Sequence, residues 1–507
     1  MKQLAWLIGS SWILHDSNEN SPQKSKKKSE EKQTQSLAVM SIQNIGIWMA
    51  TMLIPCLAVV YGISGRADGL KRAAEDIQCY NTCRLRVAES IPVNISFPGA
   101  MMPETTFEAW MRLISHAENG LVIAAYKSSL QGHHVLDPID LHFSIEGDTI
   151  FQQLKERGAE IDIQMIESFP PKDRGDNEDG NILERLGLLN RRKLEMKRAL
   201  KRDGKMHSKF LMADDKHFYM GSANLDWRSL NQKMELGFVV EDCPCLGKDL
   251  RSIFDTYWRL SVGDSVSAAA RYNKEKPLHM SIDGAETEAF IAASPQILNA
   301  GQRTWDLEAL VDMLDSAREF VHVHVMDYHP IFVYGRGKEL WPTLDDALRR
   351  AVARGVHVRV LSAAIHHPEI GIRFLKSLQD LDGINRNGSV QVKIFKVPPP
   401  PAATSSVIIR DRRTHNKVVV TEEAAAVGTS NWSGDYFEGG TTGTAIVIRQ
   451  RGDQRPLIQQ LSSIFFRNWN SKYAHPVHEY FEHCIRRREA DFCETEKDPR
   501  LFDHRKY

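Results

Sequence analysis

The sequence predicts an α/β protein with two repeated domains, each a sheet covered by helices, following an N-terminal membrane-spanning helix. Three observations support this prediction. The chain has 507 residues, which suits two domains of roughly 150 to 200 residues better than one. It repeats a pattern in which apolar strands alternate with helices. Near its N-terminus it also contains an uncharged apolar segment that is long enough to cross a bilayer.

The membrane-spanning prediction depends on residues 45–63. No charged residue occurs within 33–65, and 45–63 is almost wholly apolar. As an α-helix this segment matches the hydrocarbon thickness of a bilayer, whereas a buried core helix is seldom so long. Lysines at 24–28 precede it, a bias that keeps the N-terminus in the cytosol. We therefore expect a disordered cytosolic tail at 1–44, a transmembrane helix at 45–63 and a luminal stalk at 64–85.

Cysteines and glycosylation sequons agree with a luminal C-terminal part. Six cysteines outside the predicted span form three close pairs, which favours disulfides in an oxidising compartment: Cys79 and Cys83, Cys243 and Cys245, Cys484 and Cys493. The alternative is a zinc site made of the first four, although Cys-Pro-Cys is poor zinc spacing. Sequons at Asn94 and Asn387 are glycosylation acceptors only in the lumen. A third, at Asn431, belongs to a motif that we assign to chemistry, so we expect it to stay unmodified.

An internal repeat defines the two domains. Two helix–strand units of the first half return in the second half, 115–126 as 316–328 and 154–163 as 348–360. In the second unit the helix is expected to end at a C-cap glycine, Gly158 or Gly355. Both halves close with apolar residues at helical spacing. We therefore predict a first domain at 86–265, a linker at 266–284, a second domain at 285–475 and a C-terminal tail at 476–507.

Each half carries one copy of a motif that combines histidine, lysine, a carboxylate, serine and asparagine. The first copy comprises His207, Lys209, Asp214, Ser222 and Asn224, and the second comprises His415, Lys417, Glu422, Ser430 and Asn431. The apolar run after each lysine predicts a strand, so the histidine and the lysine project from one face toward one pocket. The carboxylate five residues beyond the lysine is expected to hold an imidazole in one tautomer. One copy would be typical of a surface strand, but two copies at matching places predict a shared site.

These residue types suit the cleavage of a phosphodiester. Its negative oxygens resist attack, so the lysines must neutralise them while the asparagines and serines donate hydrogen bonds. One neutral histidine is expected to attack phosphorus while the other, protonated, gives its proton to the departing oxygen and then activates water. This inventory requires no metal, and a structural divalent ion is compatible with it. The pair His322 and His324 is a weaker metal candidate, which we interpret as part of a core strand.

The paired motif resembles the signature of the phospholipase D superfamily. Within it, the sequence is most similar to the animal type II membrane group, phospholipase D three and four, which are endolysosomal 5′-exonucleases of single-stranded DNA and RNA. The similarity runs from about Cys79 to Trp469 and includes residues 220–230, Glu235-Leu-Gly and residues 427–434. The resemblance implies two pseudo-symmetric phospholipase D-like α/β/α sandwich domains with one site between them, in which Glu235 supports the catalytic residues.

The resemblance also implies a disulfide pattern and a location. Cys79 and Cys83 would pair with Cys245 and Cys243, in a single-pass type II membrane protein that passes from endoplasmic reticulum and Golgi to the lumen of late endosomes and lysosomes. The sequence departs from the group in two places. Ala125-Tyr-Lys-Ser replaces an aromatic-rich stretch, and a cysteine expected near Ala363 is absent. We therefore expect Cys484 and Cys493 to pair with each other.

The choice of substrate lies between nucleic acid and lipid. Because the formal net charge is zero, only local patches can attract a polyanion. Residues 191–205 carry eight basic side chains just before His207, and Arg410, Arg412 and Arg413 stand just before His415. At the rim of a site they would favour a single-stranded polyanion. The alternative for 191–205 is a solvated helix face.

We therefore predict a phosphodiesterase that hydrolyses single-stranded DNA or RNA from the 5′ end through a phosphohistidine. The alternative is a phospholipid transphosphatidylase or phospholipase that forms bis(monoacylglycero)phosphate, which a membrane tether suits. A catalytically inactive, membrane-tethered binding protein is the third class. The predicted partners are a nucleic-acid strand, the lipid bilayer and, for the alternative, a phospholipid substrate; a homodimer is also compatible.

Overall fold

The computed structural model describes residues 69–265, 268–363, 368–400 and 406–486. The chain divides into two compact units, residues 1–74 and 75–507, and every described strand belongs to the second unit. The expected cytosolic tail, the transmembrane helix at 45–63 and Cys493 lie outside the described residues. Within the described ranges, no helix is both long enough and apolar enough to cross a membrane.

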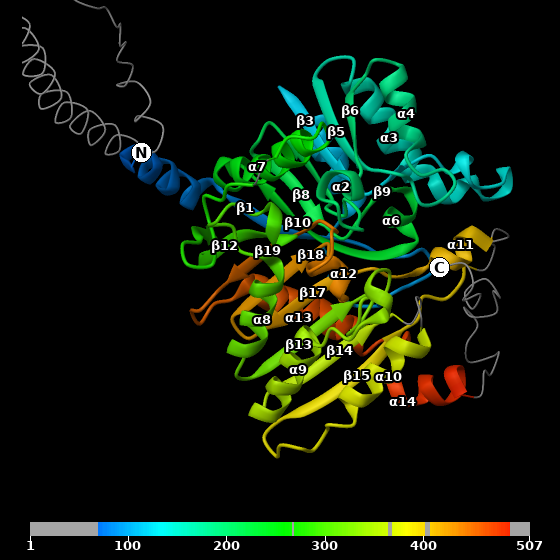
Figure 1. Cartoon of the computed structure of the whole chain (residues 1–507), viewed down its shortest axis with the longest axis vertical. Coiled ribbons are helices and arrows are strands. Elements are labelled where there is room, and N and C mark those ends of the chain that lie inside the picture. The colour runs from blue at the N-terminus through cyan, green and yellow to red at the C-terminus, as the bar shows by residue number, and fades with distance from the viewer. Residues whose placement is uncertain (1–68, 266–267, 364–367, 401–405, 487–507) are drawn as a thin grey trace, which may run out of the picture. The chain divides into compact units, whose positions relative to one another are not determined.

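The first domain is built on a mixed sheet with the strand order β2-β1-β10-β8-β7-β3-β5-β6 (Figure 1). Its strands are β1 (Arg84–Ser90), β2 (Glu104–Thr105), β3 (Gly120–Ala125), β5 (Asp162–Ser168), β6 (Asn190–Leu194), β7 (Phe210–Ala213), β8 (His217–Gly221) and β10 (Lys233–Glu241). A separate small sheet pairs β4 (Ser128–Ser129) with β9 (Leu225–Asp226). The helices are α2 (Thr106–Ser115), α3 (Ile145–Arg157), α4 (Glu178–Arg185), α5 (Met196–Leu200), α6 (Trp227–Asn231) and α7 (Pro244–Leu260).

The second domain is built on a sheet with the order β11-β12-β19-β18-β17-β13-β14-β15-β20. Its strands are β11 (Leu278–Ile282), β12 (Ala285–Ser294), β13 (Phe320–Val325), β14 (His357–Ser362), β15 (Ser389–Phe395), β17 (Lys417–Thr421), β18 (Ala424–Gly428), β19 (Gly443–Arg449) and β20 (Ala474–Pro476). The helices are α8 (Asp306–Ser316), α9 (Thr343–Arg354), α10 (Pro368–Gln379), α11 (Ser406–Asp411), α12 (Gly434–Phe437), α13 (Pro456–Trp469) and α14 (Val477–Tyr480). The sheet thus reaches into the predicted linker through β11 and into the predicted tail through β20.

Seven strands follow the same order in both sheets. The path β1-β10-β8-β7-β3-β5-β6 corresponds to β12-β19-β18-β17-β13-β14-β15. In each path the last three strands are parallel, and the remaining neighbours are antiparallel. The repeated segments fall on β3 and β13 and on β5 and β14, each behind a helix. The α/β prediction and the assignment of these repeats to strands are confirmed.

Local chemistry explains where the repeated helices begin and end. Thr105 starts α2 through a capping box, because its hydroxyl accepts from the amide of Glu108 while the Glu108 carboxylate accepts from the amide of Thr105. Gly355 ends α9 in the left-handed conformation, with φ of 96°. Gly158 ends α3 in a right-handed conformation instead. There the glycine is needed for space, since a Cβ would lie 2.3 Å from the carbonyl oxygen of Leu188.

The two sheets share one hydrophobic core. Leu250, Ile253 and Phe254 of α7, together with Leu461 and Ile464 of α13, belong to a single buried cluster that includes strands of both sheets. The helix α7 of the first domain contacts β12 of the second, and α13 of the second contacts β1 of the first. This cross-packing ties the positions of the central strands together, and the central strands carry the motifs.

Two disulfides connect the segment before β1 to the start of α7. Cys79 is bonded to Cys245 and Cys83 to Cys243, as the resemblance implied. The alternative, a zinc site made of these four cysteines, is wrong. The side chain of Cys484 lies outside the part of the chain that the structure describes, so its pairing stays a prediction.

Candidate active site

The two His-x-Lys motifs lie at equivalent places in the two sheets, directly before or at the start of β7 and β17. His207 and His415 are each 6% exposed, and Lys209 and Lys417 are 2% and 4% exposed. Each lysine Nζ donates a hydrogen bond to the carbonyl oxygen of its own motif histidine, with a distance of 2.6 Å from Lys209 to His207. Four groups that carry or can carry positive charge are thus buried at the starts of two central strands.

Contacts between the domains bring the two motifs together. The segment before the second motif forms β16 (Arg413–Thr414), which pairs with the start of β10 in the first domain. The amide of His415 then donates to the carbonyl oxygen of Met234 at 2.8 Å. In the opposite direction, the amide of His207 donates to the hydroxyl of Thr442 in the second domain at 2.9 Å. Each motif histidine is therefore held by the other domain, and both lie at one site.

The carboxylate that orients an imidazole is Glu235 of β10. Its Oε2 lies 2.7 Å from Nδ1 of His415, and it also accepts hydrogen bonds from Ser222 at 2.6 Å and, through Oε1, from Ser229 at 2.7 Å. Only 1% of Glu235 is exposed. Three partners thus fix both oxygens, so the carboxylate can hold one tautomer of His415 and stabilise its protonated form.

Asp214 and Glu422, which we expected to hold the imidazoles, do something else. Asp214 accepts hydrogen bonds from the backbone amides of 118–120, at 2.7 to 3.1 Å. Glu422 accepts from the amides of 318–320, at 2.8 to 3.4 Å. Each carboxylate therefore binds the turn that leads into β3 or β13. The reason is the rise of a strand, about 3.3 Å per residue, which carries the fifth residue to the opposite end of the sheet from the lysine.

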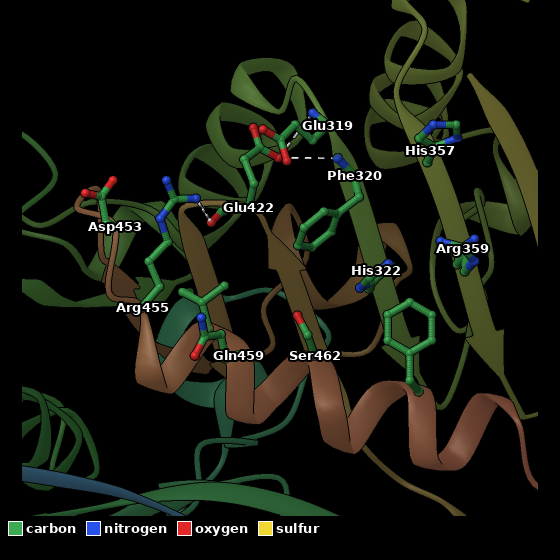
Figure 2. A pocket seen from close by; sticks show the side chains of 12 residues that line it. Glu319, Phe320, His322, His357, Arg359, Glu422, Asp453, Arg455, Gln459 and Ser462 are labelled. Carbon is green, nitrogen blue, oxygen red and sulfur yellow. Dashed lines mark hydrogen bonds between the residues drawn. The ribbon is translucent and has the colours of Figure 1, made fainter. Parts of the chain in front are cut away.

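Figure 2 shows where Glu422 lies. Its carboxylate is bonded at the amide of Phe320, on the wall of a pocket of about 570 Å³ that is lined by residues of β13, β14 and α13. His415 and Lys417 are not among the described residues that line this pocket. For the equivalent Asp214, burial would raise the pKa, but the three backbone donors outweigh it and hold the pKa below its usual value. Both carboxylates are structural in this geometry.

The two serines predicted to bind phosphate are also engaged elsewhere. Ser222 donates its hydroxyl hydrogen to Glu235, and Ser430 donates to Asp306 at 2.9 Å. Asp306 is 2% exposed and also accepts from Ser294. Since a hydroxyl has one hydrogen to donate, neither serine has a donor left for a phosphate. The expectation is corrected: these serines position buried carboxylates.

Asn224 and Asn431 stay candidates for binding phosphate. They are 4% and 2% exposed, and Nδ2 of Asn431 donates to the hydroxyl of Tyr436 at 2.9 Å. The Oδ1 atoms of both asparagines, like Nδ1 of His207, are buried without a hydrogen-bond partner among the described residues. An amide can be turned to present its nitrogen instead, and the Tyr436 hydroxyl can donate as well as accept. Buried polar atoms without partners can mark a ligand site, and Asn431 is connected to His207 through Tyr436, whose ring lies beside that histidine.

Two tyrosines outside the two motifs enclose the first histidine. The ring of His207 lies 5.0 Å from the ring of Tyr126 and 5.0 Å from the ring of Tyr436, centroid to centroid. Tyr126 directly follows β3, and Nζ of Lys209 lies 5.1 Å from the centre of its ring. Burial raises the pKa of Tyr126 to about 12, so it stays neutral. The signal for it was its place after the strand that adjoins β7.

The site is electrostatically prepared for an anion. Burial, and then the neighbouring lysines, lower the pKa of His207 and of His415 well below the usual range. Burial also lowers the pKa of Lys417 to about 7 and lowers that of Lys209. The positive charge on each of these groups therefore disfavours the protonated form of the other three. A phosphodiester placed among them would relieve this repulsion and raise all four pKa values.

The two histidines are not equivalent. Gly221 of β8 pairs with Gly237 of β10, and Gly428 of β18 pairs with Ala445 of β19, so Gly443 takes the place that Glu235 has in the first domain. A Cβ at Gly443 would lie 2.1 Å from Oγ of Ser430. The second domain therefore offers no carboxylate from this position to His207; the backbone of Thr429 lies beside that imidazole instead and raises its pKa against the larger effect of burial.

His324 braces the second motif. Its Nε2 lies 2.6 Å from the hydroxyl of Thr414, and its Nδ1 lies 3.1 Å from Nδ2 of Asn416. In this orientation of the Asn416 amide, its nitrogen donates to Nδ1 of His324, so Nε2 carries the hydrogen. Burial lowers the pKa of His324 to about 3, which keeps this neutral tautomer. No cluster of three or more potential metal ligands occurs in the described ranges, and His322 is stacked on Phe465 with ring centroids 4.6 Å apart.

The basic segments expected at the rim serve two purposes. Arg191 is buried against Glu167 at 2.7 Å, and Arg412 donates to Gln232 at 2.6 Å, so these two arginines are structural. Other side chains of the first segment are exposed: Lys193, Lys197, Arg198, Lys201 and Arg202. The segment then meets the second domain, because the amide of Thr442 donates to the carbonyl of Lys205 at 2.9 Å. Exposed positive charge thus leads to the site from the side of His207.

Comparisons with known proteins place this geometry in a family. The family profile described as "PLD3/4, PLD-like domain" matches residues 99–399. The sequence is 37% identical over 414 residues to human 5′-3′ exonuclease PLD3, covering 79% of this chain and 82% of that one. It is 37% identical over 416 residues to human 5′-3′ exonuclease PLD4, covering 79% and 80%. The fold resembles that of a phosphatidylserine synthase from Haemophilus influenzae Rd KW20, with a TM-score of 0.50 and 11% identity over 78% of this chain and 92% of that chain. The chain therefore belongs to the PLD3/4 family of phospholipase D-like proteins.

Proposed function

We propose that this protein is a phosphodiesterase that removes nucleotides from the 5′ end of single-stranded DNA or RNA. The observation that carries the proposal is the meeting of His207 and His415, one from each domain, in a buried site with Lys209 and Lys417. Two such imidazoles supply a nucleophile and a proton donor, and the lysines neutralise the phosphate oxygens. Nucleic acid is favoured over lipid because relatives that align over most of their length are named 5′-3′ exonucleases.

The different surroundings of the two histidines support different roles. His207 has no carboxylate partner, which favours the neutral form that a nucleophile needs. His415 is bonded to Glu235 at 2.7 Å, which favours the protonated form that an acid needs. In the first step, His207 forms a bond to phosphorus while the bond from phosphorus to the departing oxygen breaks, and that oxygen takes the proton of His415. In the second step, neutral His415 takes a proton from water, the water oxygen binds phosphorus, and the bond to His207 breaks.

The finer architecture and setting are part of the proposal. The equal strand order supports two domains related by an approximate two-fold axis through the site. The two disulfides and the exposed sequon residues Asn94 and Asn387 support a luminal enzyme anchored by residues 45–63. The histidine, lysine and asparagine side chains supply every group that the two steps need, so the chemistry proceeds without a metal.

The experiment offers two substrates to the full-length protein in detergent, at acidic pH with a chelator. One is single-stranded DNA with a 5′-hydroxyl end, and the other is phosphatidylglycerol. We expect nucleotides to be released from the DNA, and release to be slowed strongly when the 5′ end is blocked. Turnover of the lipid alone would contradict the proposed nuclease activity and favour the alternative, a transphosphatidylase. A strict need for added metal would contradict the mechanism.

A further inference from the structure

Lys233 is a buried cation beside the site that belongs to neither motif. It is the first residue of β10, two residues before Glu235, so both side chains leave the same face of the strand. Where β10 pairs with β16, Lys233 lies opposite Arg413. Arg413 precedes His415 by two residues. Lys233 therefore stands at the domain contact that holds His415, on the side of the site where the proposed acid lies.

Its burial is comparable to that of the groups that must reach substrate. Lys233 is 6% exposed, as are His207 and His415. Burial lowers its pKa, and its charge in turn contributes to the lowered pKa values of His415, Lys209 and Lys417. The charge of the ammonium group thus acts on the motif residues, and the strand places its side chain on the same face as that of Glu235.

Lys233 differs from its charged neighbours because no direct hydrogen bond or ion pair holds its Nζ among the described residues, although Asp226 and Asp411 attract its charge from farther away. Lys127 lies 3.0 Å from both Asp176 and Asp226. Arg228 lies 2.9 Å from Asp226 and 2.9 Å from a carboxylate oxygen of Asp411, and Arg413 lies 3.3 Å from the other oxygen of Asp411. Removing an ammonium group from water without a partner is costly. A buried lysine that no carboxylate holds by a direct hydrogen bond, next to reacting groups, keeps its donors for a ligand.

We propose that Lys233 binds the next phosphate of the departing nucleic-acid strand, one nucleotide beyond the phosphodiester that is cleaved. The proposal rests on the function proposed above. The phosphate that is cleaved already has Lys209, Lys417 and the two asparagines, so a further cation on the side of the acid is placed for the strand that the acid releases. A phosphate is the anion that recurs at every nucleotide of that strand.

The test compares two substrates that differ by one phosphate. Thymidylyl-thymidine has only the phosphodiester that is cleaved, whereas the trinucleotide of thymidine carries one more on the departing strand. In the full-length protein, Lys233→Gln should lower kcat/KM for the trinucleotide about tenfold more than for the dinucleotide, mostly through KM. Lys233→Arg should keep most of the preference of the wild type for the trinucleotide. The control is Lys376→Gln. It removes a lysine of α10 that is paired with Asp380, and it should change kcat/KM for neither substrate.

Each outcome decides between the two proposals. If the wild type cleaves neither substrate, the nuclease and the phosphate subsite both fail. If the wild type cleaves both and Lys233→Gln loses equally on both, Lys233 acts at the cleaved phosphate or on His415, so the subsite is wrong while the nuclease stands. If Lys233→Gln does not fold, Lys233→Met replaces it, because an unbranched apolar side chain fills similar space. A preference for the trinucleotide that survives in Lys233→Met would overturn the subsite.

Discussion

The two motif histidines are held in different surroundings, although their sequences repeat. His415 bonds Glu235 through Nδ1, and His324 braces the residues on either side of it. His207 lies between two tyrosine rings, with the backbone of Thr429 beside its imidazole. A duplicated sequence has therefore given one imidazole a carboxylate partner and the other two aromatic neighbours. The lesson is that any difference in role between the two histidines must come from the residues around the motifs, because the motifs themselves are alike.

The largest expected effect comes from removing either histidine. His207→Asn and His415→Asn should each lower turnover of single-stranded DNA by at least about 10⁴-fold, since neither half holds both nucleophile and acid. They should differ on a nitrophenyl phosphodiester, whose leaving group departs without a proton. His415→Asn should then accumulate a phosphohistidine at His207, detectable by mass spectrometry of the intact protein.

The outcome with His207→Asn tests the division of roles. This variant should form no phosphohistidine with the activated ester. An adduct on His415 in that variant would reverse the assignment, and near-normal turnover of DNA by either variant would show that the two domains do not share one site.

The second effect concerns the carboxylate that distinguishes the two halves. Glu235→Gln should lower kcat about 100-fold, because the amide cannot stabilise a protonated His415 as the carboxylate does. His415 would then lose its proton at a lower pH. The alkaline limb of the profile of kcat/KM against pH, which requires a protonated acid, should therefore move toward lower pH. The profile is measured on single-stranded DNA over pH 4.5 to 8.

Asp214→Asn is the matched control for Glu235→Gln. Its carboxylate accepts hydrogen bonds from the backbone amides of 118–120 and contacts neither motif histidine in the described ranges, so the change should leave the pH profile in place. It should lower the free energy of unfolding by about 1 to 2 kcal/mol, since hydrogen bonds to a charged acceptor are weakened. A shift of the alkaline limb in Asp214→Asn, without one in Glu235→Gln, would exchange the roles that the geometry gives these two carboxylates.

How much of the site can be predicted from the sequence depends on how far apart the contacting residues lie along the chain. His207 with Lys209, and His415 with Lys417, are two residues apart, so strand geometry places each pair and the repeat brings the pairs together. Asp214 and Glu422 were assigned wrongly, although the predicted strands, which rise about 3.3 Å per residue, already carry the fifth residue after each lysine to the far end of the sheet.

The contact between Glu235 and His415 could not be derived from spacing, and the supporting role expected of Glu235 came from the family resemblance. Glu235 and His415 are separated by 180 positions, and they meet only because β16 pairs with β10. That contact needs three-dimensional packing, which a periodic pattern does not contain. The α/β alternation behaves differently, because each helix and strand depends on near neighbours. For the same reason Gly443 could not be recognised as the counterpart of Glu235 without the strand register.

The third effect concerns the brace that only the second motif has. His324→Leu should keep the apolar contacts of β13 but leave the hydroxyl of Thr414 and the amide of Asn416 without their partner. Unsatisfied buried polar groups cost about 1 to 3 kcal/mol each, so the free energy of unfolding should fall by a few kcal/mol. Turnover should fall about tenfold, because His415 is displaced from Glu235. Urea unfolding and kcat on DNA measure the two effects, and an unchanged kcat would show that the brace does not position His415.

The smallest effect is a difference in how acid changes the stability of the two halves. Burial and nearby lysines lower the pKa of both motif histidines, so the folded protein binds fewer protons there than the unfolded chain, whose histidines titrate near about pH 6.5. Stability must therefore fall as the pH drops below about 6.5, by about 1.4 kcal/mol per pH unit for each such histidine.

Sulfate, which keeps its charge in this range, should occupy the site and favour a protonated His415. The rise in melting temperature caused by sulfate should then grow from pH 7 to pH 5 in the wild type and in His207→Asn, but not in His415→Asn. If the growth disappears in His207→Asn and persists in His415→Asn, the proton in the complex sits on His207, and the comparison between the two halves must be inverted.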